Sequence, residues 1–328
     1  MKVLIIVTKA EIGGAQIFVL NLAQGLKNKG YEVSVAFGKG DFLSQELDKY
    51  GIKYFRLKNL ERTNNLFSMF LFIKELKNLI DKEKFDIIHF NSSNTLLGVI
   101  SAKLSKTKSE TIFTIHGLSV LDPNNKSIFI LKYIYKLYFK FFLSYVDKVV
   151  FVSKFNLEEI ERQKILVKGF IVYNGLDLGP ASFLNRAEAI NELNKFINID
   201  LSGSYLIGSV GRLAYPKNYE FLIQTWPEIK KNKPNAKLII IGEGPERFKY
   251  EKLIKSLDLQ NDIFLPGQMN YSSRVLKAFD LFILSSIFEG LSVSLIEAVY
   301  AGIPALASRV GGNEEIIGVN NCFILNNK

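Results

Sequence analysis

Three consecutive stretches at the start of the chain decide how it folds. Residues 2–8 read KVLIIVT, residues 11–16 read EIGGAQ, and residues 32–37 read EVSVAF. The first and third are apolar runs of strand length, and Gln16–Lys29 between them places apolar residues at helical spacing. Two apolar strands joined through a helix pair side by side in a parallel sheet that helices cover on both faces. The opening of the chain therefore predicts a strand–helix–strand unit.

The same alternation runs along the rest of the chain, interrupted by the polar stretch Asp177–Gly203. Further strands are predicted at Lys53–Leu57, Ile87–Asn91, Thr111–Ile115, Lys148–Val152, Gly169–Tyr173, Tyr205–Val210, Lys237–Ile241, Ile263–Pro266, Leu281–Leu284 and Ala305–Ala307. Further helices are predicted at Ser44–Tyr50, Leu66–Asp81, Leu96–Ser105, Ser127–Tyr145, Asn156–Gln163, Tyr219–Lys231, Glu246–Leu257, Ser272–Phe279 and Val293–Ala301. Alternation of this kind predicts two doubly wound α/β domains, residues 1–178 and 179–328, with ligands bound in a cleft at the carboxyl ends of the strands.

Composition narrows the function before any motif is considered. The net charge of +10 favours anionic partners, but the basic residues are spread along the chain and match no nucleic-acid motif. Nucleic acid is therefore not predicted as a partner. The single cysteine, Cys322, excludes an intrachain disulfide and fits a reducing, cytoplasmic setting. Polar Thr8 and acidic Glu11 follow the first apolar run too early for a signal peptide, and no stretch reaches the roughly 18 apolar residues of a membrane-spanning helix.

In the first half of the chain, glycines and histidines at strand ends are candidate ligand-binding residues. Gly13 and Gly14 open a predicted helix and let the backbone approach a phosphate, although a tight turn explains them equally well. His116 directly follows the strand Thr111–Ile115, which favours a ligand contact over a structural role. His89 lies inside a strand pattern, which favours a structural role.

In the second half, Arg212 and Lys217 lie five residues apart in a loop after a predicted strand. An arginine fork and a compact ammonium group can converge on one diphosphate; the alternative is ordinary surface charge. Gly242 and Gly244 follow the next strand, where a flat ligand or simply a sharp turn needs glycine. The glycines of the segment Val310–Glu315 are explained mostly by a turn.

The segment from Glu289 to Glu297 is the most informative motif. Gly290, Leu291 and Ser292 lead into a helix whose first N–H groups are free to bind a phosphate. Glu297 lies between apolar neighbours in that helix, where an acid costs free energy unless it is paired. A carboxylate can accept hydrogen bonds from both hydroxyls of a sugar diol. The alternative partner is a cation of the protein core.

Missing patterns exclude other chemistry. The sequence contains no Asp-x-Asp, no His/Cys/Asp cluster at metal-ligand spacing and no Gly-x-Ser-x-Gly. We therefore predict no metal, no cofactor and no acyl-enzyme.

In their order along the chain, these pieces resemble the retaining glycosyltransferases of the GT-B fold, and among them glycosyltransferase family 4. The resemblance covers nearly the whole chain and is carried by Gly13–Gly14, Phe113–Gly117, Val152–Lys154, Tyr173–Asp177, Gly211–Leu213 with Lys217, Gly242–Gly244, Glu289 with Glu297, and Val310–Gly312. It implies two Rossmann-like domains, with residues 1–178 on the acceptor side and residues 179–328 binding a nucleotide sugar. The chain stops at Lys328, before several closing elements of the family, so the second domain is expected to be truncated.

The resemblance also implies roles for individual residues. Arg212 and Lys217 hold the donor diphosphate and stabilise the departing charge. Glu289 and His116 lie near the transferred sugar, and Glu297 binds the nucleotide ribose. The implied donor-binding residues are Gly13, Gly14, Arg212, Lys217, Gly242, Gly244, Gly290, Leu291, Ser292 and Glu297. The implied chemistry is metal-free transfer with retention, by attack on the leaving-group face, preferably from a UDP-sugar.

Within the family, the chain is similar to bacterial enzymes that build surface polysaccharides. The similarity lies in Ser92–Ser93, Phe113–Gly117 and Asn185–Ala189, while Asn91 and Ser292 depart from the commoner pattern. The expected reaction is transfer of a hexosyl or N-acetylhexosaminyl group to a glycan or lipid-linked acceptor. A sugar-nucleotide epimerase and a catalytically silent nucleotide-sugar-binding protein are the competing hypotheses.

The segment Ser127–Tyr145 combines apolar and aromatic residues with Lys132, Lys136 and Lys140 at intervals of four. Such a helix can lie on an anionic membrane or pack on the first domain with a lysine edge, and the pattern does not separate the two. The run Leu66–Ile73 gives weaker support to the membrane. The predicted location is therefore cytoplasmic, with peripheral attachment to the inner face of the cell membrane as the open alternative.

Overall fold

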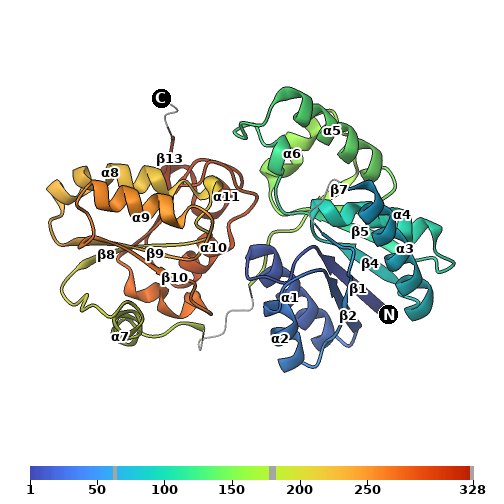
Figure 1. The fold of residues 1–328 in the computed structure, drawn as a ribbon, viewed down its shortest axis with the longest axis horizontal. Coiled ribbons are helices and arrows are strands. Elements are labelled where there is room, and N and C mark those ends of the chain that lie inside the picture. Colours follow the sequence, from blue (N-terminus) through green and yellow to red (C-terminus); the bar gives the residue numbers. More distant parts are fainter. Residues whose placement is uncertain (62–64, 177–181, 326–328) are drawn as a thin grey trace. The chain divides into compact units, whose positions relative to one another are not determined.

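The computed structural model describes residues 1–61, 65–176 and 182–325, which form two units (Figure 1). The first unit is Met1–Gly175 and the second is Leu176–Lys328. The predicted boundary between residues 178 and 179 falls in the segment 177–181, outside the described residues. Each unit is a doubly wound α/β fold, as predicted.

The first unit is built on a parallel sheet with the strand order β3-β2-β1-β4-β5-β6-β7. Its strands are β1 Lys2–Val7, β2 Glu32–Phe37, β3 Lys53–Arg56, β4 Ile87–Phe90, β5 Glu110–Ile115, β6 Lys148–Phe151 and β7 Gly169–Ile171. Its helices are α1 Gly14–Asn28, α2 Phe42–Lys49, α3 Leu66–Glu83, α4 Val99–Leu104, α5 Phe129–Leu143 and α6 Lys154–Arg162, with the 3₁₀ turns η1 Ser93–Gly98 and η2 Ser119–Leu121.

Both faces of this sheet are buried because its strands are apolar on both sides. Val3, Ile5 and Val7 of β1 face a core shared with α1 and α2. Leu4 and Ile6 face a second core shared with α3, α4, α5 and α6. Alternate residues of a strand point to opposite faces, so an uninterrupted apolar run requires this double cover.

The second unit repeats the plan with the strand order β10-β9-β8-β11-β12-β13. Its strands are β8 Tyr205–Val210, β9 Ala236–Ile241, β10 Ile263–Gly267, β11 Leu281–Leu284, β12 Ala305–Ser308 and β13 Cys322–Phe323. Its helices are α7 Arg186–Ile197, α8 Tyr219–Asn232, α9 Arg247–Ser256, α10 Val293–Tyr300 and α11 Asn313–Ile317, with the 3₁₀ turns η4 Tyr215–Lys217, η5 Ser272–Ala278 and η6 Val319–Asn321. In both units the order reverses beside the first strand, and this reversal opens the crevice in which such sheets bind ligands.

The structure departs from the predicted elements in the polar stretch and at the end of the chain. Helix α7 was not predicted, although Asn185 caps it and exchanges hydrogen bonds with Glu188 in a capping box. Its buried residues Ala189 and Leu193 pack in the core that also contains η5. The predicted helix Ser272–Phe279 is a 3₁₀ helix, η5, and the two-residue strand β13 is too short to be recognised from its pattern.

Candidate functional site

Two loops at the carboxyl end of the second sheet are joined backbone to backbone. After β8, Gly211 N–H donates to Ile241 O at 3.0 Å and Leu213 N–H donates to Glu243 O at 3.0 Å. A Cβ atom on Gly242 would lie 2.0 Å from Gly211 O, and one on Gly244 would lie 2.2 Å from Leu213 O. Close packing of two protein backbones therefore requires both glycines, independently of any ligand.

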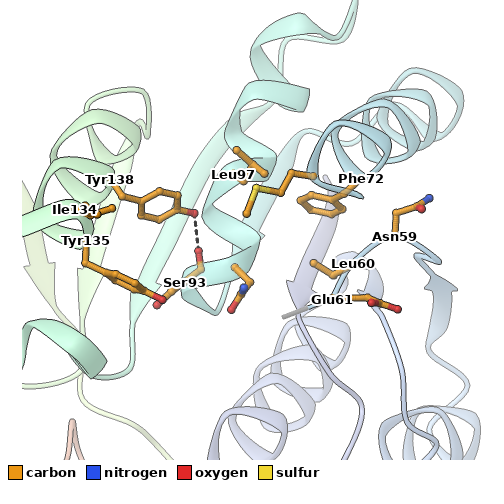
Figure 2. A pocket seen from close by; sticks show the side chains of 11 residues that line it. Asn59, Leu60, Glu61, Phe72, Ser93, Leu97, Ile134, Tyr135 and Tyr138 are labelled. Carbon is orange, nitrogen blue, oxygen red and sulfur yellow. Dashed lines mark hydrogen bonds between the residues drawn. The ribbon is translucent and has the colours of Figure 1, made fainter. Parts of the chain in front are cut away.

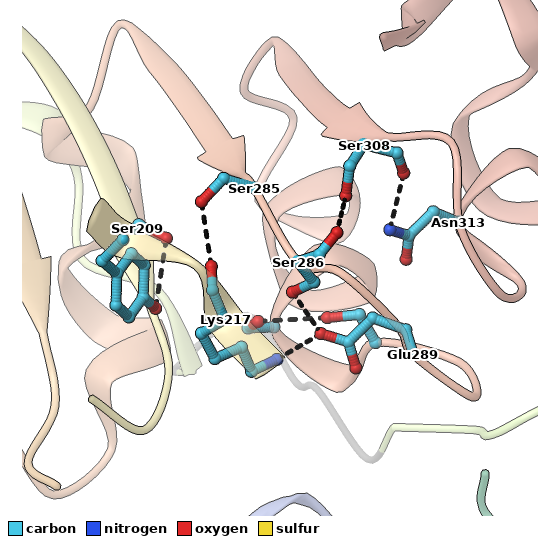
Figure 3. A network of polar contacts seen from close by, with 10 residues as sticks. Ser209, Lys217, Ser285, Ser286, Glu289, Ser308 and Asn313 are labelled. Atoms are coloured by element: carbon cyan, nitrogen blue, oxygen red, sulfur yellow. Dashed lines mark hydrogen bonds and ion pairs between the residues drawn. The ribbon is translucent and has the colours of Figure 1, made fainter. Parts of the chain in front are cut away.

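Lys217 and Glu289 meet at the centre of a polar network (Figure 3). Lys217 Nζ lies 2.5 Å from Glu289 Oε1, and Ser286 Oγ donates to the same carboxylate oxygen at 2.6 Å. Ser285 Oγ donates to the backbone oxygen of Lys217 at 2.9 Å. Both partners of the ion pair are largely buried, with side chains 20% and 14% exposed. The loops after β8 and β11 are thus held together by the two residues that the sequence nominated for diphosphate and sugar.

A second set of contacts fixes the loop that follows Glu289. Gly312 N–H donates to Gly290 O at 2.8 Å, and Ser308 Oγ donates to Ser286 O at 2.5 Å. Gly311 adopts a positive φ of 55°, and a Cβ atom there would lie 2.2 Å from Glu289 O. The loop after β12 therefore packs against the backbone of Glu289 and fixes its position.

Arg212 differs from Lys217 in its surroundings. Its side chain is exposed, and it makes no hydrogen bond or ion pair with any described residue. The same loop thus offers one cation that is already engaged and one that is free to meet an anion.

Helix α10 starts directly after this loop. Gly290, Leu291 and Ser292 lead into it, and Ser292 is its N-cap. The Ser292 hydroxyl makes no capping bond and lies 3.3 Å from Ser294 Oγ. The first N–H groups of a helix have no partner within the helix, so this end of α10 favours an anion.

Glu297 lies one turn further along α10. Burial raises the pKa of its carboxyl group from 4.5 to about 7. Among the described residues, no side chain or backbone group forms a hydrogen bond or ion pair with the Glu297 carboxyl group. The alternative prediction, an ion pair with a cation of the core, is therefore not found among them. Because the side chain is only partly covered, a ligand hydroxyl can reach the carboxylate and stabilise its charged form.

The predicted site residues of the first unit follow the carboxyl ends of β1 and β5. Gly13 is the N-cap of α1, and Gly14 is the first residue of that helix. Gly13 is extended, and a Cβ atom on it would lie 2.8 Å from Gln16 Oε1. The Gln16 amide in turn donates to Lys9 O at 2.8 Å, so a side chain at position 13 would disturb the contact that shapes the turn.

His116 contacts two residues that were not predicted to belong to the site, Asn91 and Phe18. Its Nε2 lies 3.2 Å from Asn91 Oδ1, and its ring meets Phe18 edge to face with centroids 4.5 Å apart. Burial, reinforced by the charge of neighbouring His89, lowers the pKa of His116 to about 3. Because Asn91 Nδ2 donates to His89 O, Asn91 Oδ1 is the acceptor and His116 Nε2 carries the proton. His116 is therefore a neutral ring with a lone pair on Nδ1.

His89 has a structural environment. Its Nε2 lies 2.7 Å from Thr114 Oγ1 inside the sheet, and burial lowers its pKa to about 4. The sequence reasoning missed Asn91 and Phe18 as supports of His116. The only available signal was their position just after a strand and early in a helix.

Two doubly wound, parallel-sheet units in one chain are the architecture of the GT-B glycosyltransferases. Residues 12–179 match the model described as Glycosyltransferase Family 4, and residues 191–327 match Glycosyl transferases group 1. The chain belongs to glycosyltransferase family 4.

Relatives and solved structures extend over nearly the whole chain. UDP-Gal:alpha-D-GlcNAc-diphosphoundecaprenol alpha-1,3-galactosyltransferase of Escherichia coli is 26% identical, over 96% of this chain and 79% of that enzyme. The O-antigen biosynthesis glycosyltransferase WclY of Escherichia coli is 25% identical, over 94% of this chain and 80% of that protein. Anabaena Alr3699/HepE, solved with UDP-glucose, shares the fold with a TM-score of 0.77 at 18% identity, over 99% of this chain and 85% of that one.

Proposed function

We propose that this glycosyltransferase moves a hexosyl or N-acetylhexosaminyl group from a UDP-sugar to a glycan or lipid-linked acceptor in surface polysaccharide biosynthesis. The observation that carries the proposal is the joined pair Lys217–Glu289 beside the start of α10, with the unpaired carboxyl of Glu297 one turn further on. The Escherichia coli relatives support the acceptor class, since one is named for a diphosphoundecaprenol acceptor and the other for O-antigen biosynthesis.

In the proposed complex the donor runs along the start of α10. The diphosphate meets the N–H groups that follow Gly290, together with Arg212 and Lys217. The ribose diol donates two hydrogen bonds to Glu297, which favours the ionised carboxylate. This arrangement matches each part of the donor to a group of complementary charge in one unit.

Donor binding requires Lys217 to change partner. In the free enzyme its ammonium group is neutralised by Glu289 at 2.5 Å. A diphosphate carries more charge than one carboxylate, so it competes for the ammonium and releases Glu289 toward the sugar. As the bond to the anomeric carbon breaks, Arg212 and Lys217 stabilise the growing charge on the leaving diphosphate, which is the role that a metal ion plays in other transferases.

Retention at the anomeric carbon is part of the proposal because it is what the resemblance to the retaining glycosyltransferases implies. We assign Glu289, whose Oε1 contacts Lys217 and Ser286 in the ligand-free structure, to binding the sugar and not to forming a covalent intermediate. The acceptor then attacks on the face that the diphosphate leaves. Neutral His116 serves as a hydrogen-bonding group for a sugar hydroxyl, since a pKa of about 3 removes any role as a cation.

The experiment is a panel of UDP-, GDP- and ADP-sugars, followed by release of nucleotide and by transfer to acceptor. Arg212→Ala is expected to lower turnover about 10²-fold or more, the range seen when one transition-state donor is removed. Glu297→Ala is expected to weaken donor binding, and with it transfer at limiting donor, because it removes the acceptor of the ribose hydroxyls. Arg309→Ala is the matched control, because Arg309 is an exposed arginine of the same unit paired with Glu314. Normal transfer in both site variants would refute the assignment. Tight binding without turnover would indicate a silent binding protein, and conversion of the sugar without nucleotide release would indicate an epimerase.

A further inference from the structure

The first unit contains a cavity of about 210 Å³ that the donor chemistry does not use (Figure 2). It lies between α3, η1, α5 and the loop after β3. Its lining comes from these four segments: Asn59, Leu60, Glu61, Met69, Phe72, Ser93, Asn94, Leu97, Ile134, Tyr135 and Tyr138. The volume is about seven times the share of one water molecule in the liquid.

The walls of the cavity are mainly apolar. Phe72 of α3 lies on one side, and the α5 side chains Ile134 and Tyr138 lie on the other (Figure 2). Met69 of α3 also lines the cavity. The Tyr138 hydroxyl donates to Ser93 O at 2.9 Å, so its polar end already has a partner. A cavity with such walls offers water little and favours an apolar occupant.

The surface beside the cavity is apolar as well. Ile130, Ile134, Leu137 and Phe141 follow one another at helical spacing along α5, and each is exposed, by 66%, 55%, 48% and 54%. At the start of α3, Leu66, Phe67 and Phe70 are exposed too. Exposed apolar side chains that gather in this way on a folded unit mark contact with another apolar phase or partner.

Charge on α5 indicates which partner. The helix carries Lys132, Lys136 and Lys140 and no acidic residue. In the described structure Lys136 and Lys140 form no ion pair, and Lys132 reaches only the backbone oxygen of Asp122. Exposed apolar side chains bordered by unpaired lysines match an anionic lipid surface.

We propose that the cavity takes one hydrocarbon chain of a phosphate-bearing membrane lipid while α5 lies on the bilayer surface. The chain enters beside Ile134, which both lines the cavity and belongs to the exposed apolar face. The lipid phosphate stays outside, within reach of the α5 lysines. If the lipid is the acceptor itself, this assignment rests on the proposed function; the binding of the chain can be measured without turnover.

The test uses n-alkyl phosphates of six, eight and ten carbons, each below its micelle concentration, with binding followed by titration calorimetry. Affinity is expected to rise about fourfold per methylene while the chain fills the cavity. Leu97→Trp fills the cavity from η1 and is expected to weaken decyl phosphate binding at least tenfold and to abolish the dependence on chain length. Phe129→Ser is the control, because Phe129 is exposed at the start of α5 and does not line the cavity.

Several outcomes would overturn the proposal. These are equal affinity for decyl phosphate in wild type and Leu97→Trp, binding of inorganic phosphate as tight as that of decyl phosphate, or an equal loss in Phe129→Ser. Thermal unfolding checks the variants, and Ile134→Trp replaces Leu97→Trp if the latter does not fold, because that rim position is half exposed. Release of nucleotide from a UDP-sugar is measured alongside. If that activity is absent while alkyl phosphates bind as expected, the proposed function fails and the lipid-chain site stands.

Discussion

The carboxyl group of Glu297 makes the stability of the second unit depend on pH, and Glu297→Gln removes that dependence. Burial holds its pKa at about 7 in the folded protein, against 4.5 in an exposed chain. The folded state therefore binds the proton more tightly than the unfolded state. Below about pH 4.5 both states are protonated and nothing is lost; as pH rises from there to about 7, the unfolded state ionises first and stability falls.

The difference between 4.5 and about 7 corresponds to about 3 kcal/mol. Wild-type protein should thus lose about 3 kcal/mol of unfolding free energy between pH 4.5 and 8 through this group. A glutamine of the same shape stays neutral, so Glu297→Gln should gain stability relative to wild type as pH rises and should match it near pH 4.5.

The assay is urea unfolding followed by tryptophan fluorescence at pH 5, 6, 7 and 8. Trp226 is the single tryptophan of the chain and is 1% exposed in a core of the second unit, so its emission reports on the unit that contains Glu297. Glu228→Gln is the matched control, an acid of the same unit with a side chain 71% exposed. A difference between wild type and Glu297→Gln that stays constant from pH 5 to 8 would refute the burial argument.

Three further results are expected. Glu289→Gln frees Lys217, so UDP should bind more tightly in calorimetry while turnover falls; weaker UDP binding would contradict the exchange of partners. Gly311→Ala should cost about 1–3 kcal/mol in urea unfolding, because the site needs a positive φ and the added carbon would lie 2.2 Å from a carbonyl oxygen; an unchanged midpoint would contradict it. Lys136→Gln and Lys140→Gln should each lose about 1 kcal/mol of binding free energy to anionic liposomes, measured by sedimentation at low salt. Wild-type binding that is equal at low and high salt would exclude an electrostatic contact.

The parallel sheets were predictable because their strands carry the simplest signal. Runs such as Val3–Val7 and Tyr205–Val210 are apolar on both faces, and only a strand covered by helices on both sides can bury them. The segment around α7 was not predictable by that criterion, since Ala189 and Leu193 are its only fully buried positions. The capping box of Asn185 and Glu188 does indicate a helix start in the sequence, but the polar composition of the stretch argues against a packed helix.

The candidate site was predictable in its residues but not in its contacts. A loop after a strand places Lys217 and Glu289 at the same edge of the sheet, yet 72 residues separate them in the chain and nothing local specifies that they touch. Their supports are serines at strand ends, such as Ser285 and Ser286, which resemble any other turn serine in sequence. Whether Glu297 is paired depends on every neighbour of α10, so its environment required the structure.

Glu289 and Glu297 are both uncharged to an approaching donor, but for different reasons, and this difference predicts the order in which the donor engages them. Glu289 is already neutralised by Lys217, so it presents no net charge to an approaching diphosphate. Glu297 is unpaired, and near neutral pH a large fraction of its carboxyl groups is protonated and uncharged. Arg212 is therefore the cation left to attract the donor. When the diphosphate binds Lys217, the Glu289 carboxylate becomes free to bind the sugar. When the ribose hydroxyls bind Glu297, they favour its ionised form. At pH 6, UDP binding should then release more protons from wild type than from Glu297→Gln, by up to about one, beyond the release from the terminal phosphate of UDP that both proteins share. Calorimetry in two buffers of different ionisation enthalpy measures the difference directly.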